Sequence, residues 1–115
     1  MKLQAALPKI SYAPTVEAAL TEHDKCLLEE YLNEVRSFWL RAPSKVSRVV
    51  VDLYIDKEED IRTISVTHCV DADADEALGY WNLVGQELEC WASGVAANNA
   101  KAVLDLVSTD VQWRT

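Results

Sequence analysis

Between residues 28 and 39 the apolar side chains recur at steps of three and four residues, which is the period of a helix with one buried face. The buried stripe would comprise Leu28, Tyr31, Leu32, Val35, Phe38 and Trp39. Ahead of this stripe, the sequence "TEHD" has the form of a capping box, with Thr21 as the N-cap and Asp24 in the acidic position. The helix should end near Ala42, because Pro43 disfavours helical geometry in the residue before it.

The period changes to two after this helix, which predicts β-strands. In the first strand Val49, Val51, Leu53 and Ile55 share one face, and Arg48, Val50, Asp52 and Tyr54 share the other. In the second strand Ile64, Val66, His68 and Val70 alternate with Thr63, Ser65, Thr67 and Cys69. The acidic segment "DKEED" lies between the two strands. They should form a hairpin with one apolar face against the core and one more polar face that stays open.

A segment rich in carboxylates, "HCVDADADEALGYW", follows the second strand and admits two interpretations. The aspartates at 71, 73 and 75 match the first half of a calcium-binding loop. The loop then lacks its glycine, because Glu76 stands there, and its bidentate glutamate, because Asn82 stands there. Alternatively, Asp73 is the N-cap of a second helix whose dipole favours acidic residues in the first turn. We favour the cap and predict no metal site.

This second helix would bury a stripe of Ala77, Trp81, Val84, Leu88, Trp91 and Val95. The two ends of the chain carry weaker patterns. "KISYA", residues 9–13, alternates between two prolines and predicts an edge strand, although residues 1–14 could instead be irregular. Residues 100–113 fit either a helix or a strand, and their valine, threonine and tryptophan content favours the strand.

Strand, helix, strand, strand, helix, strand is the element order of the ferredoxin-like fold. We therefore expect one α+β domain over residues 1–115. Its architecture would be a two-layer sandwich, with an antiparallel sheet and both helices on one face of that sheet. This fold hosts many unrelated functions, so it implies no activity by itself.

The chain has 115 residues and a formal net charge of −8, which makes nucleic acid an unexpected partner because phosphate would repel it. No apolar run is long enough to cross a bilayer, and the start of the chain does not resemble a signal peptide. We therefore expect no membrane association and a cytoplasmic location. Cys26, Cys69 and Cys90 are odd in number and widely spaced, which favours free thiols over disulfides or a zinc site.

Motifs that carry catalytic chemistry are missing from the sequence. There is no glycine-rich phosphate loop, no GxSxG and no HExxH. His68 and Cys69 are neighbours in a strand, so their side chains point to opposite faces and cannot act together as base and nucleophile. His68 should instead be buried and hydrogen-bonded. We predict no catalytic residue and no cofactor, which argues against an enzyme.

One end of the expected fold should be strongly acidic, because the start of the first helix and the hairpin turn would meet there. The carboxylates concerned belong to Glu22, Asp24, Asp56, Glu58, Glu59 and Asp60. A surface of this charge would attract a basic protein partner. The alternative is a solvated acidic end that only maintains solubility.

The open face of the hairpin is a second candidate surface, and it would carry Arg48, Val50, Asp52, Tyr54, Thr63, Ser65, Thr67 and Cys69. We expect it to be covered by a second subunit, because it is too apolar to stay fully hydrated. The predicted function is a small, acidic, non-catalytic protein-interaction module that self-associates through this face and docks a basic partner. The alternative is a dimeric, α+β-barrel-like small-molecule-binding protein or enzyme with a pocket on this face, lined by Arg48, Asp52, Tyr54 and Cys69.

Overall fold

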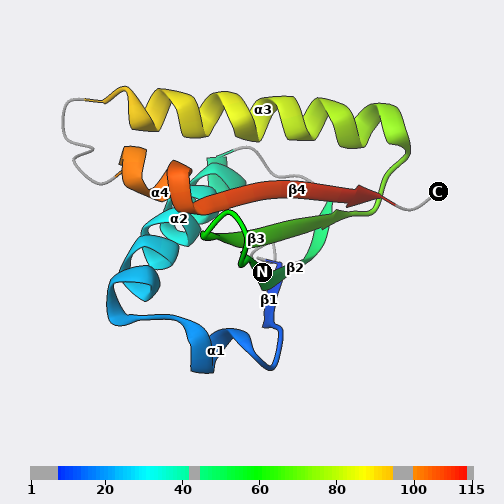
Figure 1. Ribbon diagram of the computed structural model, residues 1–115. Helices are drawn as coiled ribbons and strands as arrows, with labels where there is room; N and C mark the ends of the chain where they lie inside the picture. The colour runs from blue at the N-terminus through cyan, green and yellow to red at the C-terminus, as the bar shows by residue number, and fades with distance from the viewer. Residues whose placement is uncertain (1–7, 42–44, 95–99, 114–115) are drawn as a thin grey trace, which may run out of the picture.

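The computed structural model describes residues 8–41, 45–94 and 100–113 and shows an α+β protein, as predicted (Figure 1). In chain order the elements are β1 (Lys9–Tyr12), α1 (Val16–Ala19), α2 (Glu22–Arg41), β2 (Val46–Asp56), β3 (Ile61–Val70), α3 (Ala74–Ala92), α4 (Ala100–Leu106) and β4 (Val107–Trp113). Among these helices, none combines the length and the apolar character needed to cross a bilayer.

The strands form one four-stranded sheet in the order β1-β2-β3-β4. β1 is parallel to β2, β2 is antiparallel to β3, and β3 is parallel to β4. The sheet is thus mixed rather than antiparallel, and its strand order does not match the predicted ferredoxin-like one. In the ferredoxin-like arrangement a third strand separates the two parallel strands of each β-α-β unit, whereas here those strands are adjacent.

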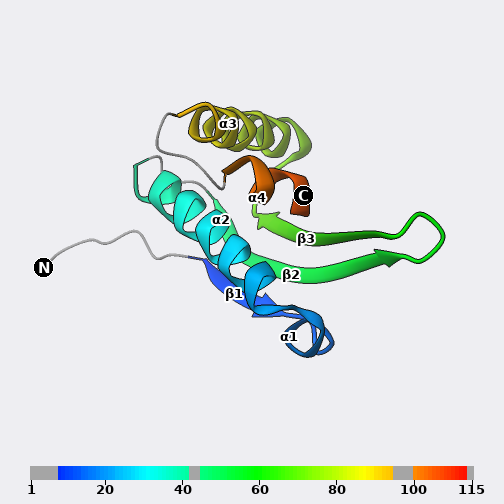
Figure 2. The same ribbon diagram turned by 60° about the vertical axis from the view of Figure 1, so that its left-hand side comes forward.

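Helices α2 and α3 pack on the same face of the sheet. His68 of β3 lies between them, with its ring in contact with Tyr31 of α2 and Tyr80 of α3. The apolar residues that the alternation assigned to this face include Val49, Val51, Ile64, Val66 and Val70, and all of these are buried. The opposite face carries exposed and half-buried side chains, and no described helix packs on it (Figure 2).

Both long helices begin at the predicted caps. Asp24 N donates to Thr21 Oγ1 at 3.0 Å, and Thr21 N donates to Asp24 Oδ2 at 3.1 Å, which completes the capping box of α2. The carboxylate of Asp73 accepts a hydrogen bond from Glu76 N at 2.9 Å at the start of α3. The cap interpretation of the aspartate-rich segment is confirmed, and Lys45 Nζ lies 3.2 Å from Glu76 Oε2 beside it.

The buried stripe of α3 differs from the predicted one at its aromatic positions. Tyr80 is 7% exposed, whereas Trp81 is 39% exposed. Tyr80 is buried because its hydroxyl hydrogen-bonds His68 inside the core. Trp81 Nε1 instead donates to the carbonyl of Thr109 in β4 at 3.2 Å. Val95 lies outside the described residues.

The two ends of the chain are more structured than their patterns indicated. β1 is the predicted edge strand, and the short helix α1, which the sequence pattern did not predict, follows it. The tail was expected to be a strand or a helix, and it is both: α4 ends at Leu106 and β4 begins at Val107. The helical and alternating patterns in residues 100–113 therefore belong to different parts of the tail.

The β2–β3 hairpin extends beyond the rest of the sheet (Figure 2). β1 pairs with β2 only over residues 48–51, and β4 pairs with β3 only over residues 64–70. Residues 54–56 and 61–63 are therefore paired only with one another within the sheet, and residues 52 and 53 pair with β3 but not with β1. We call residues 52–63 the ribbon arm. Because a two-stranded ribbon alone is only marginally stable in water, support from elsewhere in the fold matters to the arm.

Candidate functional sites

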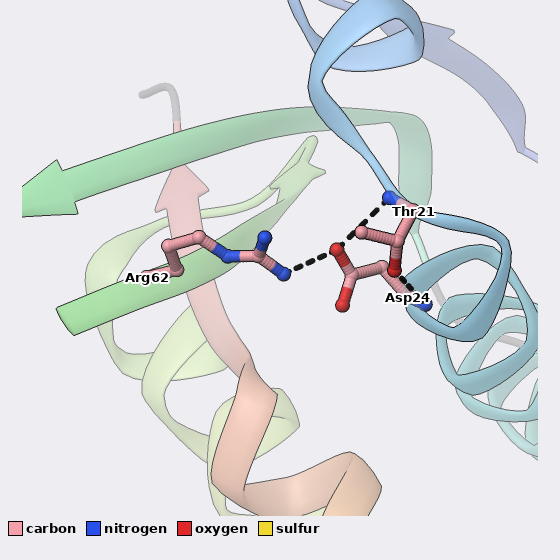
Figure 3. Close-up of polar contacts among 3 residues, drawn as sticks. All are labelled: Thr21, Asp24 and Arg62. Carbon is pink, nitrogen blue, oxygen red and sulfur yellow. Dashed lines mark hydrogen bonds and ion pairs between the residues drawn. The ribbon is translucent and has the colours of Figure 1, made fainter.

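The ribbon arm is tied to α2 by an ion pair from Arg62, which lies one strand pair before the turn. The guanidinium of Arg62 donates to Oδ2 of Asp24, which is also the acceptor in the capping box (Figure 3). Burial opposes the ionisation of Asp24, but its bonds with Thr21 and Arg62 together hold the pKa of this carboxyl below its ordinary value. Asp24 was one of the predicted partner-binding residues, but it is buried and links α2 to the ribbon arm.

The turn at the end of the arm presents carboxylates to solvent. Asp56 Oδ1 accepts hydrogen bonds from Glu58 N at 3.1 Å and Glu59 N at 3.2 Å, so Asp56 shapes the turn. Asp60 adopts a positive φ of 55°, which aspartate tolerates better than most residues. Glu58, Glu59 and Asp60 are exposed, and we call these three residues the acidic tip. Glu22, the last predicted member, lies on α2 with Oε1 3.7 Å from Lys25 Nζ.

Exposed apolar side chains lie on the arm just behind the acidic tip. Tyr54 is 60% exposed, Ile55 is 50% exposed and Ile61 is 47% exposed. Tyr54 and Ile61 are on the open face of the sheet, because their strand partners are Thr63 and Asp56 respectively. The two isoleucines were not predicted as site residues. The sequence did contain an indication of these exposed residues. Isoleucine stands directly on each side of the acidic loop, at positions near a strand end where polar residues would be expected.

The eight residues predicted for the open face do share one face. They form the cross-strand pairs Arg48–Cys69, Val50–Thr67, Asp52–Ser65 and Tyr54–Thr63. Several of their polar groups bond locally: Ser65 Oγ donates to Asp110 Oδ2 at 2.9 Å, and Asp52 Oδ1 accepts from Leu53 N at 2.8 Å. Away from the arm the predicted residues of this face are mostly polar: Arg48, Val50, Ser65, Thr67 and Cys69. Its large exposed apolar side chains, Tyr54 and Ile61, are confined to the arm.

A continuous chain of polar groups runs through the core beneath the other face. Trp39 Nε1 donates to Tyr80 Oη at 2.9 Å, and Tyr80 Oη lies 2.5 Å from His68 Nδ1. On the other side of the ring, His68 Nε2 lies 3.0 Å from Tyr31 Oη, which lies 2.7 Å from Thr109 Oγ1. The expected burial and hydrogen bonding of His68 are confirmed, since its side chain is 0% exposed.

The direction of this chain follows from its donors. Tyr80 Oη already accepts from Trp39, so its own proton is best donated to His68 Nδ1. The ring proton is then on Nε2 and is donated to Tyr31, which in turn donates to Thr109. Protonating Nδ1 would leave the Tyr80 proton without an acceptor in this chain. Burial lowers the pKa of His68 to about 4, in agreement with a neutral ring. We assign the network a structural role, because its central groups are closed to solvent.

A second group of charges joins α2 to α3 at the surface. Arg41 Nη2 lies 2.6 Å from Glu87 Oε2 and 4.0 Å from Glu34 Oε2. Burial, with the neighbouring Glu87 carboxyl, raises the pKa of Glu34 to about 7, and Arg41 acts in the opposite direction. The two carboxyls thus share one guanidinium. The sequence did not predict that Arg41 would pair with Glu87, because the local pattern does not determine the relative position of α2 and α3 along their axes.

A hollow of about 430 Å³ lies where β2 begins and where β3 and β4 end. It is lined by Ser47, Arg48, Cys69, Val70, Asp71, Gln112 and Trp113. Of the pocket residues expected in the small-molecule alternative, Arg48 and Cys69 lie here, whereas Asp52 and Tyr54 do not.

Metal-binding geometry does not occur in the part of the chain that the structure describes: no three His, Cys, Asp or Glu residues are grouped so that they could hold an ion. Cys26, Cys69 and Cys90 are free thiols. Comparison with protein-family models, with curated protein sequences and with solved structures gave no match. Any function must therefore be inferred from the surfaces themselves.

Proposed function

We propose that this protein is a small, acidic, non-catalytic protein-interaction module, and that the ribbon arm is the element that docks its partner. One observation carries the proposal: Tyr54, Ile55 and Ile61 remain 60%, 50% and 47% exposed on a hairpin that projects out of the sheet. Exposed apolar side chains gathered on a projecting element, rather than scattered singly, are typical of protein-binding surfaces.

The arm is also preorganised for binding. Arg62 fixes the arm to α2, and Asp56 fixes the turn at its end. An arm that is already ordered loses less conformational entropy when a partner binds, so more of the contact energy appears as affinity. Tyr54 would be the main anchor, because tyrosine buries a large rigid surface and keeps a hydroxyl for hydrogen bonding.

The charge of the acidic tip favours a basic partner at the tip, and self-association through the open face would compete with that partner for Tyr54. Glu58, Glu59 and Asp60 lie in the turn directly beyond the exposed Tyr54 and Ile61 of the open face, and Lys57 is the basic residue among them. Two copies that met tip to tip would bring like charges together, which is unfavourable. A partner with an apolar depression and a basic rim would instead match both features of the arm.

The test reverses charge at the tip and compares it with an equal reversal elsewhere. Glu58→Lys with Glu59→Lys changes the tip, and Glu89→Lys with Asp105→Lys changes exposed positions on α3 and α4 by the same net charge. Asp60 is left unchanged because lysine tolerates its positive φ poorly. Partners captured from lysate by the native protein are identified, and their association rates are measured with all three proteins at two salt concentrations.

We expect the tip variant to associate about tenfold more slowly at low salt and the difference to shrink at high salt, because screening weakens steering. Tyr54→Ser should accelerate dissociation, whereas Leu83→Ser, which removes an equally exposed apolar side chain from α3, should not. Equal rates for the tip variant and its control would leave the acidic tip with a role in solubility only.

A further inference from the structure

The hollow at the end of the sheet holds two charged groups that have no partner among the residues the structure describes. Arg48 and Asp71 both line it, and neither side chain forms an ion pair or hydrogen bond with the other or with another residue in the described ranges. Lys45, by contrast, is paired with Glu76. A ligand that carried one charge of each sign could pair with both groups at once.

The local backbone explains why Arg48 stands at the rim of this hollow. The β2–β3 register shifts between Val46 and Arg48, and the extra residue, Ser47, donates through Oγ to the carbonyl of Cys69 at 3.2 Å. This bulge re-aims the strand at its start. Beyond it, Arg48, Cys69 and Gln112 are in register across β2, β3 and β4.

The aligned side chains of Arg48, Cys69 and Gln112 place hydrogen-bond donors along one side of the hollow. The thiol of Cys69 donates to Gln112 Oε1 at 3.8 Å, which occupies the amide oxygen and leaves the amide N–H groups of Gln112 for a ligand. The guanidinium of Arg48 offers a planar pair of donors that matches a carboxylate. Lys9, in register with Arg48 on β1, adds a further positive charge on this side.

The remaining walls supply an acceptor and an apolar surface. Asp71 follows directly after β3, and its carboxylate suits an ammonium group. Trp113, in register with the buried Val70, is 44% exposed and offers an apolar surface for a side chain. A volume of about 430 Å³ is within the range of small-molecule sites, roughly 300 to 1,000 Å³.

We propose that this hollow binds a free α-amino acid with an aromatic or large apolar side chain. The carboxylate pairs with Arg48 and Gln112, the ammonium pairs with Asp71, and the side chain lies against Trp113. This site is separate from the ribbon arm, so the proposal does not depend on the docking function.

The experiment titrates the full chain with L-phenylalanine and L-leucine and follows backbone amide and tryptophan indole signals by NMR. Glycine lacks the side chain, 3-phenylpropanoate lacks the ammonium and phenethylamine lacks the carboxylate. The variants are Arg48→Gln and Asp71→Asn. Their matched controls, Lys57→Gln and Asp105→Asn, remove the same charges at exposed positions away from the hollow.

We expect saturable shifts at Val70, Gln112 and Trp113 with L-phenylalanine or L-leucine, and weaker binding of the three truncated ligands. Each hollow variant should weaken binding about fivefold, the size expected for one exposed charge pair. Asp71→Asn should no longer discriminate L-phenylalanine from 3-phenylpropanoate, which links that carboxylate to the ammonium. The proposal is overturned if neither amino acid saturates below about 10 mM, a concentration well above an ordinary weak site, or if the control variants weaken binding equally.

Discussion

The neutral, sealed ring of His68 should make the folded state less stable in mild acid. An unfolded chain protonates this histidine near pH 6.5, whereas the folded chain does so only at a pKa of about 4. Between these values the unfolded state binds more protons, so the free energy of unfolding falls as the pH falls. The full effect corresponds to about 3 kcal/mol.

Glu34 acts in the opposite direction and must be removed to see this effect. Its pKa is raised from 4.5 to about 7 on folding, so its contribution is complete below pH 4.5 and is lost as the pH rises towards 7. In Glu34→Gln, urea unfolding should show stability that decreases steadily from pH 7 to pH 4. A flat profile in this variant would mean that His68 titrates equally in both states.

The residues that could be assigned from sequence are those governed by local chemistry. The caps at Thr21 and Asp73 depend on contacts within three residues, and the burial of His68 follows from alternation in its strand. Helical periodicity could not separate Tyr80 from Trp81, because neighbouring positions differ by only part of a turn. The choice depended on which aromatic group could reach His68 across the core.

The ribbon arm should depend on Arg62 more than a surface ion pair would suggest. Arg62→Met keeps the aliphatic stem but leaves the buried Asp24 carboxylate without its cation. Since Arg62 is 38% exposed in its side chain, we expect a loss of about 1 to 2 kcal/mol in unfolding free energy rather than the larger value for a fully buried pair. Hydrogen exchange should also accelerate in residues 52–63 more than in the paired part of β3.

Arg36→Met is the matched control, because Arg36 pairs with Glu29 within α2 and connects no two elements. It should leave the exchange of the arm unchanged. If both variants affect the arm to the same extent, the Arg62–Asp24 contact is not its support.

The elements with a clear period were predictable, but the arm was not. The hairpin follows from alternation on both sides of the "DKEED" turn. Its projection follows from the lengths and registers of β1 and β4, which stop short of the turn. Those registers are set by long-range pairing, so the local pattern of the hairpin contains no signal for them.

At the scale of the whole molecule, self-association through the open face stays a prediction. Val50, Tyr54 and Ile61 share that face, and covering them would remove apolar surface from water. Sedimentation at about 50 µM, well above the dissociation constant of an ordinary stable interface, should therefore give a dimer. Tyr54→Asp should give a monomer, while Leu83→Asp, on the helical side, should not. A native protein that sediments as a monomer would contradict the prediction.

Strand order was the part of the fold that the sequence could not specify. A strand with alternating apolar and polar residues buries its apolar face whichever strand lies beside it, so the alternation carries no information about strand order. The ferredoxin-like order and the observed order β1-β2-β3-β4 satisfy the same alternation in the same chain. What separates them is how α2 and α3 meet above the sheet, and that depends on contacts such as Trp39 with Tyr80.

The antiparallel pairing of β2 with β3, with α2 and α3 on one face, also determines handedness. Seen from the helices with the strands pointing upward, a right-handed crossover places its second strand to the right of its first. β3 and β4 point in the opposite direction to β1 and β2, so the sheet must be turned by half a turn in its own plane to make β3 point upward. If β2 lies to the right of β1 in the first view, β4 then lies to the left of β3 in the second, because the strand order runs from β1 to β4 without a reversal. The β1-to-β2 and β3-to-β4 crossovers therefore have opposite hands, and one of them is the rare left-handed kind. Although both halves read strand, helix, helix, strand, no rotation can superimpose them, so they are not two copies of one folding unit.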